Sequence, residues 1–173
     1  GLEVNARLNP NHGRIMPLPI AVTTESGPIE FLYSDSGFCN GGRHEGVSRW
    51  RRGHPFRLEV KGRHLSTLLE DDPELVDRIR YVKIDAEGYD YTVLRSIEPI
   101  ILRCRPFIRA EINKQTARAE RVDFFEYIQS VGYCIHLYED DSNPRGPPIG
   151  PDDVMIQRHF DIDCVPEDDH AGS

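Results

Sequence analysis

The sequence has no C-x-x-C cysteine pair, no apolar run near the length of a membrane span and no excess of basic residues. Its four cysteines, Cys39, Cys104, Cys134 and Cys164, stand far apart. The spacing therefore gives neither a zinc-binding signature nor a dense disulfide framework. It is typical of reduced structural thiols in a reducing compartment, although it does not decide against a disulfide.

Two classes of partner, nucleic acids and membranes, are disfavoured because the chain has neither an excess of basic residues nor a long apolar run. With 21 basic and 29 acidic residues, the formal net charge is −8, which disfavours broad contact with nucleic acid or an anionic membrane. A bilayer span needs roughly 20 consecutive apolar residues, and no stretch approaches that length. We therefore expect no nucleic acid and no membrane as partner, and a cytoplasmic location.

Two local features do not change these expectations. His44, His54 and His64 have a spacing that fits no helical pair, so we expect no metal site. Arg49–Arg52 can bind an anionic acceptor or a nucleic acid backbone through charge and stacking. A solvated loop is the commoner explanation of such a run.

The composition is that of an ordinary globular domain, with 38% apolar and 29% charged residues. We expect one α/β domain over residues 1–163 and an acidic flexible tail over residues 164–173. The first residues, LEVNARLNPN, resemble the end of a helix that began earlier. They predict a fragment or a trimmed chain, with a processed or tagged native start as the alternative.

Apolar patterning predicts the order of the elements. Strands are expected in the second half of 14–22 and at 29–33, 56–61, 81–84, 106–112, 133–138 and 154–157. Helices are expected at 65–69, from Tyr89 to near Pro99, and at 122–131. The first two strands suggest a hairpin, and residues 34–55 suggest a long loop. The alternation from Tyr81 onward predicts an α/β sheet with right-handed crossovers and an antiparallel last strand.

The junction YVKIDAEGYD at Tyr81–Asp90 holds the most informative polar residues. Asp85 is the first polar residue after a predicted strand, Glu87 follows two positions later, and Gly88 allows a sharp turn or a close approach to a ligand. Ligands of open α/β sheets bind outside the carboxyl ends of the strands. Two carboxylates there can orient a substrate, accept a proton or hold a cation. Alternatively, they only stabilise the start of a helix.

The wider pattern resembles the FkbM family of methyltransferases. The residues that carry this resemblance are KIDAEGYDYTVLRSI, RPFIRAEI and FFEYIQSVGY, in this order, with weaker likeness in LEVNARLNPN, IAVTTESGPIEFLY and LEVKGRHLSTLLED. The resemblance covers about residues 1–158. It implies a class I, Rossmann-like methyltransferase fold with a mostly parallel sheet, an antiparallel last strand and S-adenosylmethionine as cofactor. The family's glycine-rich cofactor loop is not found after Gly1, which predicts a domain truncated at its N-terminus.

The resemblance also implies roles for particular residues. Asp85 is the first candidate for positioning the acceptor or acting as base, with Glu87 second and Glu111, at the end of the next strand, third. Ala21, Asp85 and Gly88 are the candidate cofactor contacts. For Glu111 the alternative is a surface carboxylate paired with Lys114 or Arg109, and for Ala21 it is core packing.

The expected activity is methylation of an oxygen in a small molecule or a glycan. One alternative is a methyltransferase-like module that binds without catalysis. The other is a divalent-cation site built from the carboxylates of Asp85 and Glu87, with Glu111 as an optional third ligand.

Overall fold

The structure, a computed structural model, describes residues 2–33, 56–65, 67, 72–86, 88–140, 142 and 145–167. They belong to two compact units, residues 1–63 and residues 64–173, and each is described by itself. The single domain expected over residues 1–163 stays a prediction. The loop expected over residues 34–55 lies outside the described residues.

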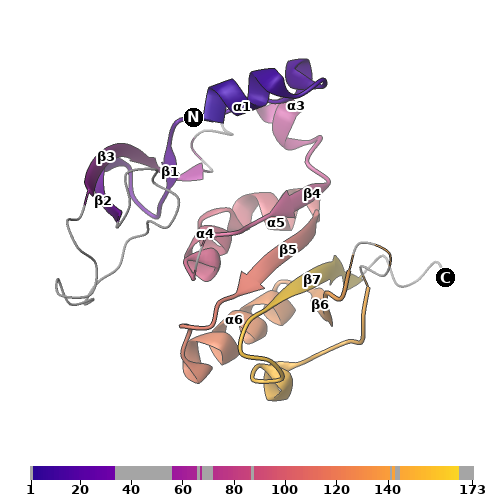
Figure 1. The fold of residues 1–173 in the computed structure, drawn as a ribbon. Helices are drawn as coiled ribbons and strands as arrows, with labels where there is room; N and C mark the ends of the chain where they lie inside the picture. Colours follow the sequence, from indigo (N-terminus) through magenta and orange to yellow (C-terminus); the bar gives the residue numbers. More distant parts are fainter. Residues whose placement is uncertain are drawn as a thin grey trace. The chain divides into compact units, whose positions relative to one another are not determined.

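The first unit contains a three-stranded sheet (Figure 1). Its elements are α1 (Leu2–Leu8), η1 (His12–Arg14), β1 (Ala21–Val22), β2 (Gly27–Tyr33) and β3 (Phe56–Arg63). Strand β3 lies in the centre, antiparallel to β2 and parallel to β1. The expected hairpin of the first two strands is therefore wrong, because β2 pairs along its full length with β3, which takes the place beside β1.

The second unit contains a mixed four-stranded sheet in the order β4-β5-β7-β6. Its strands are β4 (Tyr81–Lys83), β5 (Phe107–Ile112), β6 (Tyr133–Leu137) and β7 (Phe160–Pro166). Strand β4 is parallel to β5, whereas β7 is antiparallel to both β5 and β6. The antiparallel last strand is confirmed. The expectation of a mostly parallel sheet is not met, because β7 enters between β5 and β6 and makes two of the three pairings antiparallel.

The last strand begins later than the sequence predicted. Residues 154–157, the predicted strand, form turns and bends, and β7 starts at Phe160. The apolar signal there comes from Val154, which is fully buried outside any strand. At its other end, β7 extends to Pro166, and Cys164 and Val165 are buried. The first residues of the expected tail are thus part of the sheet.

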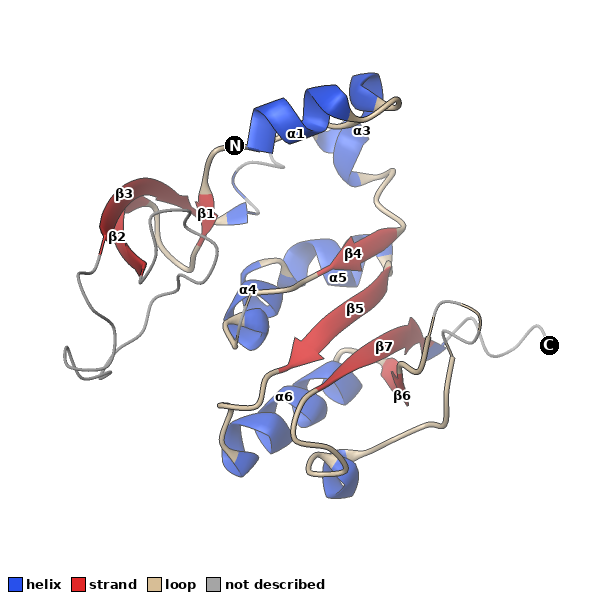
Figure 2. Ribbon diagram, in the orientation of Figure 1, coloured by secondary structure: helices blue, strands red, loops and turns tan. Residues whose placement is uncertain are grey.

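The helices of the second unit are α3 (Pro73–Val76), α4 (Asp90–Ser96), α5 (Glu98–Cys104) and α6 (Arg118–Ser130), with a 3-10 turn η3 (Pro151–Asp153). Helices α4, α5 and α6 pack on the sheet (Figure 2). Side chains alternate between the two faces of a strand. Ile108, Ala110 and Ile112 of β5 accordingly share one buried core with Leu94 and Phe125 of the helices.

Helix α5 was not expected from the sequence. Pro99 limits the helix that begins near Tyr89, as predicted, but the chain starts a new helix at once. Pro99 stands in the first turn of α5, where a backbone N–H has no partner within the helix and its loss costs little. None of the helices in the described ranges is long and apolar enough to cross a membrane.

The other face of the strands carries an ion pair. Arg109 of β5 and its register partner Asp163 of β7 form two hydrogen bonds, of 2.8 Å from Nε and 3.1 Å from Nη2. Their side chains are only 15% and 12% exposed. The Arg109 guanidinium also lies 3.7 Å from the centre of the Tyr138 ring, an arrangement that adds cation–π attraction. The pair therefore links β5 and β7, the two middle strands of the sheet, through their side chains.

We predict that Asp163→Ala lowers the free energy of unfolding by about 2–4 kcal/mol, because it removes the carboxylate that accepts two hydrogen bonds from the largely buried Arg109 guanidinium. The same substitution in an Arg109→Met background should cost much less. A double-mutant cycle by urea unfolding measures the difference. If the losses of unfolding free energy in the two single variants add up to that of the double variant within about 0.5 kcal/mol, the two side chains are not coupled.

Candidate functional site

The carboxyl end of β4 places Asp85 in solvent. The hydrogen bonding between β4 and β5 extends one residue past the end of β4. The N–H of Ile84 donates to the carbonyl of Arg109 at 2.8 Å. Asp85 follows, and its carboxylate lies 3.5 Å from the Lys83 ammonium, with the two side chains 57% and 54% exposed. An exposed ion pair of this length contributes little to stability. The Asp85 carboxylate is therefore accessible to a ligand at the sheet edge.

The turn after Asp85 uses the conformational freedom of Gly88. Its φ is +96°, in the left-handed region that favours glycine. A Cβ at this position would lie 3.6 Å from the Asn113 side chain, so the strain of a substitution comes from the backbone and not from crowding. Glu87, the second candidate from the sequence, lies outside the described residues.

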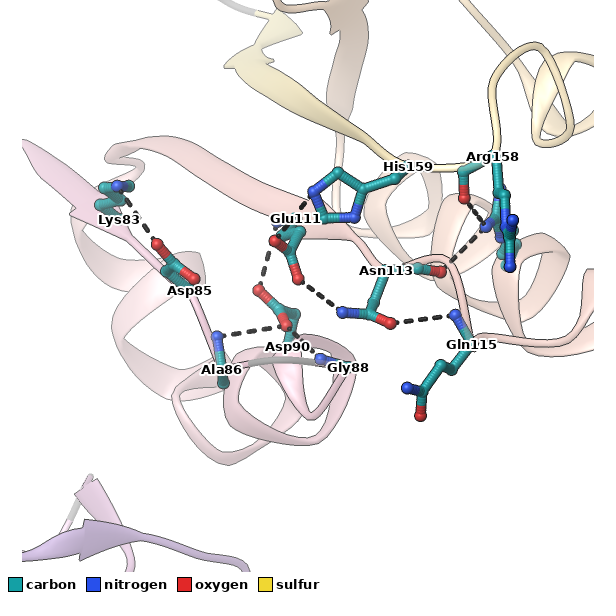
Figure 3. Close-up of polar contacts among 11 residues, drawn as sticks. Lys83, Asp85, Ala86, Gly88, Asp90, Glu111, Asn113, Gln115, Arg158 and His159 are labelled. Carbon is teal, nitrogen blue, oxygen red and sulfur yellow. Dashed lines mark hydrogen bonds and ion pairs between the residues drawn. The ribbon is translucent and has the colours of Figure 1, made fainter. Parts of the chain in front are cut away.

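A buried carboxylate joins this turn to the next strand. Asp90 is 2% exposed. Its Oδ2 accepts hydrogen bonds from the N–H groups of Ala86 at 3.4 Å and Gly88 at 3.3 Å, and its Oδ1 accepts one from Glu111 at 3.2 Å. Figure 3 shows Asp90 between the turn and the end of β5. One side chain thus fixes the carboxyl ends of both parallel strands relative to each other.

Burial sets the protonation behaviour of Asp90. Desolvation raises the pKa of this carboxyl above its ordinary value, and the nearby Glu111 charge adds to the increase. The three backbone hydrogen bonds act in the opposite direction without cancelling it. Keeping the Asp90 carboxyl ionised therefore lowers the stability of the folded protein, and protonation of this carboxyl removes that loss.

Glu111 turns toward residues that the sequence did not suggest. Its side chain is 12% exposed. Its Oε2 accepts a hydrogen bond from the Asn113 amide at 2.9 Å, and its Oε1 lies 3.3 Å from Nε2 of His159 (Figure 3). Arg109, one of the two cations proposed as its surface partner, binds Asp163 instead. Glu111 is thus a largely buried, oriented carboxylate.

A buried guanidinium holds the segment that leads to His159. Arg121 of α6 is 1% exposed, and burial lowers the pKa of its guanidinium. Among the described residues, its hydrogen bonds all go to backbone carbonyls, at 2.7–3.2 Å: those of Asn113, Thr116, Val154, Gln157 and Arg158. The turn after β5 and the segment before β7 are therefore fixed by the same side chain.

A small cavity lies beside these groups. Its volume is about 90 Å³, and its lining includes Gly88, Asp90, Glu111, Thr116, Glu120 and Phe124. That volume corresponds to roughly three water molecules at about 30 Å³ each. The cavity can hold a functional group of a ligand, not a cofactor of drug size, which occupies about 300–1,000 Å³.

The structure brings some of the predicted residues together and leaves others apart. The backbones of Gly88 and Glu111 meet at Asp90, whereas Asp85 faces Lys83 (Figure 3). Ala21 lies in β1 of the first unit, where it pairs with Gly62 of β3. Its expected role beside the cofactor stays a prediction.

Four residues of the site were missed from the sequence. Asp90 stood in the junction itself, but an Asp at a helix start is usually a capping residue. Asn113 and Arg121 carried no signal, because their bonds are to groups distant in the sequence. His159 was hidden by the strand predicted at 154–157. Among the residues that the structure describes, no three His, Cys, Asp or Glu side chains are grouped to hold a metal ion.

Comparison with known protein families identifies a methyltransferase domain in this chain. A family model described as "Methyltransferase FkbM domain" matches residues 2–135. That match covers most of the chain and includes Asp85, Gly88, Asp90, Glu111 and Arg121. The protein therefore belongs to the FkbM methyltransferase family, as the sequence motifs predicted. Searches among curated proteins and among solved structures gave no match.

We predict that Asp90 makes the protein more stable as the pH falls. Its native pKa is raised above the unfolded value of 3.8. This stabilising contribution is therefore complete below pH 3.8 and is lost as the pH rises through the native pKa. Asp90→Asn removes the titrating carboxyl. The free energy of unfolding of the wild type, relative to that of this variant, should therefore increase from neutral pH toward pH 4. Urea unfolding across this range measures it.

The exposed Asp123 on α6 provides the matched control. Asp123→Asn should leave the pH dependence of unfolding close to that of wild type. A difference between wild type and Asp90→Asn that stays flat, or shrinks as the pH falls, would contradict the assignment of a raised pKa to Asp90.

We predict that Arg121→Lys lowers the free energy of unfolding by about 2–5 kcal/mol. A lysine has three donors on one nitrogen and cannot reach all the carbonyls that Arg121 binds, and each unsatisfied buried group costs about 1–3 kcal/mol. Thermal and urea unfolding measure the loss. Arg118→Lys, at an exposed position of the same helix, should change stability by less than about 0.5 kcal/mol. Equal effects would refute the role of Arg121.

Proposed function

We propose that the protein uses S-adenosylmethionine to methylate an oxygen of a small molecule or a glycan. Membership of the FkbM methyltransferase family supports methyl transfer. The observation that carries the proposal further is the pair of strand ends fixed by Asp90, with Asp85 exposed on one and Glu111 oriented on the other. Such strand ends are where α/β sheets bind their ligands.

S-adenosylmethionine is the methyl donor that the family implies, and it would supply an electrophilic methyl group. The cavity of about 90 Å³ is too small for the whole molecule. The residues that line this cavity therefore cannot enclose the donor by themselves, and most contacts to the donor would have to come from other residues. The donor-binding roles of Ala21, Asp85 and Gly88 stay predictions.

Asp85 fits a role on the acceptor side. Its carboxylate is exposed, and its neighbour is an equally exposed lysine at 3.5 Å. A hydroxyl of an acceptor can replace that weak contact and donate a hydrogen bond to Asp85. Holding the acceptor oxygen in line with a transferable methyl group can lower the barrier of such a reaction by about 7–11 kcal/mol.

The alternative functions have less support. A cation held by Asp85, Glu87 and Glu111 would have to displace the contacts that two of these carboxylates, Asp85 and Glu111, already make with Lys83, Asn113 and His159. Glu87 lies outside the described residues. A module that binds without catalysis agrees with the small size of the cavity. Donor binding followed by methyl transfer separates these possibilities.

We predict that the protein, produced with all the residues that its gene encodes, binds S-adenosylmethionine in a calorimetric titration. It should then transfer labelled methyl groups to members of a panel of polyols and glycosides. Asp85→Asn should lower the transfer rate at least about 10-fold, because acceptor alignment is lost. Asp123→Asn should leave the rate unchanged.

The outcomes are distinct. No binding of the donor would refute the proposed function. Donor binding without transfer to any acceptor would favour the binding module, and a heat of binding with Mg²⁺ or Ca²⁺ alone would favour the cation site. A rate unchanged in Asp85→Asn would remove Asp85 from the mechanism.

A further inference from the structure

His159 lies at the same sheet edge as the two parallel strand ends. It directly precedes β7, whose first residue, Phe160, pairs with Ile112 at the end of β5. Because β7 is antiparallel to β5, the start of β7 meets the carboxyl end of β5. The family match ends at residue 135 and does not include His159.

The contact with Glu111 sets the tautomer of this histidine. Nε2 of His159 lies 3.3 Å from Oε1 of Glu111. An ionised carboxylate only accepts hydrogen bonds, so Nε2 carries the hydrogen, and in the neutral ring Nδ1 keeps its lone pair. The side chain is 49% exposed, and no contact to its Nδ1 is found among the described residues. A ligand hydroxyl can therefore reach a free basic nitrogen.

The surroundings fix this arrangement before any ligand binds. Glu111 is held from its other oxygen by the Asn113 amide at 2.9 Å. Arg121 binds the carbonyls of Asn113 at 2.9 Å and Arg158 at 2.7 Å, the latter directly before His159. The base and the residue that orients it are thus positioned by one buried side chain, and a catalytic group needs such support.

We propose that His159 is the general base for the acceptor hydroxyl and that Glu111 orients it and stabilises its protonated form. This proposal rests on the proposed methylation of oxygen. In the step, the acceptor O–H bond breaks, its proton forms an N–H bond at Nδ1, and the electron pair stays on the oxygen. S-adenosylmethionine, when bound, would supply the electrophilic methyl group for this oxygen, and its sulfur would keep the electron pair of the broken S–C bond. Asp85, on this assignment, positions the acceptor and does not take its proton.

The key variant is His159→Gln, whose amide can still donate a hydrogen bond to Glu111 but takes up no proton. It should lower kcat for labelled methyl transfer to the hydroxyl panel by about 10²–10⁴-fold. KM and the calorimetric affinity for S-adenosylmethionine should stay within about twofold, because general-base catalysis acts in the transition state. Glu111→Gln should lower kcat by a smaller factor. Arg158→Gln, at the adjacent exposed position, should have no effect.

Two further measurements separate a base from a structural residue. Added imidazole should restore part of the activity of His159→Ala and none of that of Glu111→Gln. Imidazole ¹⁵N NMR of the wild type should show the Nε2–H tautomer for His159, and Glu111→Gln should weaken that preference. An Nδ1–H tautomer in the wild type, or unchanged kcat in His159→Gln, overturns the proposal.

The failure of this proposal differs from the failure of the proposed function. If the wild type binds S-adenosylmethionine and methylates amines but no hydroxyl, the base role of His159 is refuted and methyl transfer stands. If it binds no S-adenosylmethionine, the proposed function is refuted, and the base role with it.

Discussion

The arrangement of the site depends on one buried cation, Arg121, whose hydrogen bonds within the described ranges all go to backbone carbonyl oxygens. Arg121 is fully enclosed, and no carboxylate pairs with it among the described residues. A buried charge is tolerated only when its donors are satisfied. The guanidinium offers five N–H donors in a fixed plane. It can therefore bind the turn after β5 and the segment before β7 at once, and it gives a stretch without regular secondary structure a defined path.

Asp90 is the counterpart of Arg121 with opposite charge. Among the residues that the structure describes, its two oxygens bind backbone N–H groups, from the turn after β4 and from β5. Because Asp90 and Arg121 bind backbone groups, neither forms an ion pair with the more exposed charged side chains of the site that the structure describes. Glu111 is left to bind Asn113 and His159, and Asp85 is left in solvent. Structural charges and candidate reactive charges are thus kept separate.

The sequence predicted what depends on neighbours along the chain. The elements β4, β5, α6 and β6 were found because their apolar period is local, and the junction at Tyr81–Asp90 was found because its residues are consecutive. The place of β3 between β1 and β2, the start of β7 and the partners of Glu111 depend on pairings between distant segments. Val154 shows the difference, since its apolar character was read as a strand although it packs in a turn held by Arg121.

The exposure of the site residues gives a reason to assign different roles to them. Exposure rises from 1% at Arg121 and 2% at Asp90, through 12% for the Glu111 side chain, to 49% for His159 and 57% for Asp85. A group that must meet a ligand has to be accessible, and a group that must hold its position has to be enclosed. At this edge His159 and Asp85 are therefore much more open to a ligand than Asp90. This order favours a scaffold role for Asp90 and Arg121, and it agrees with the proposal that His159, an exposed base with an oriented carboxylate behind it, takes the proton of the acceptor.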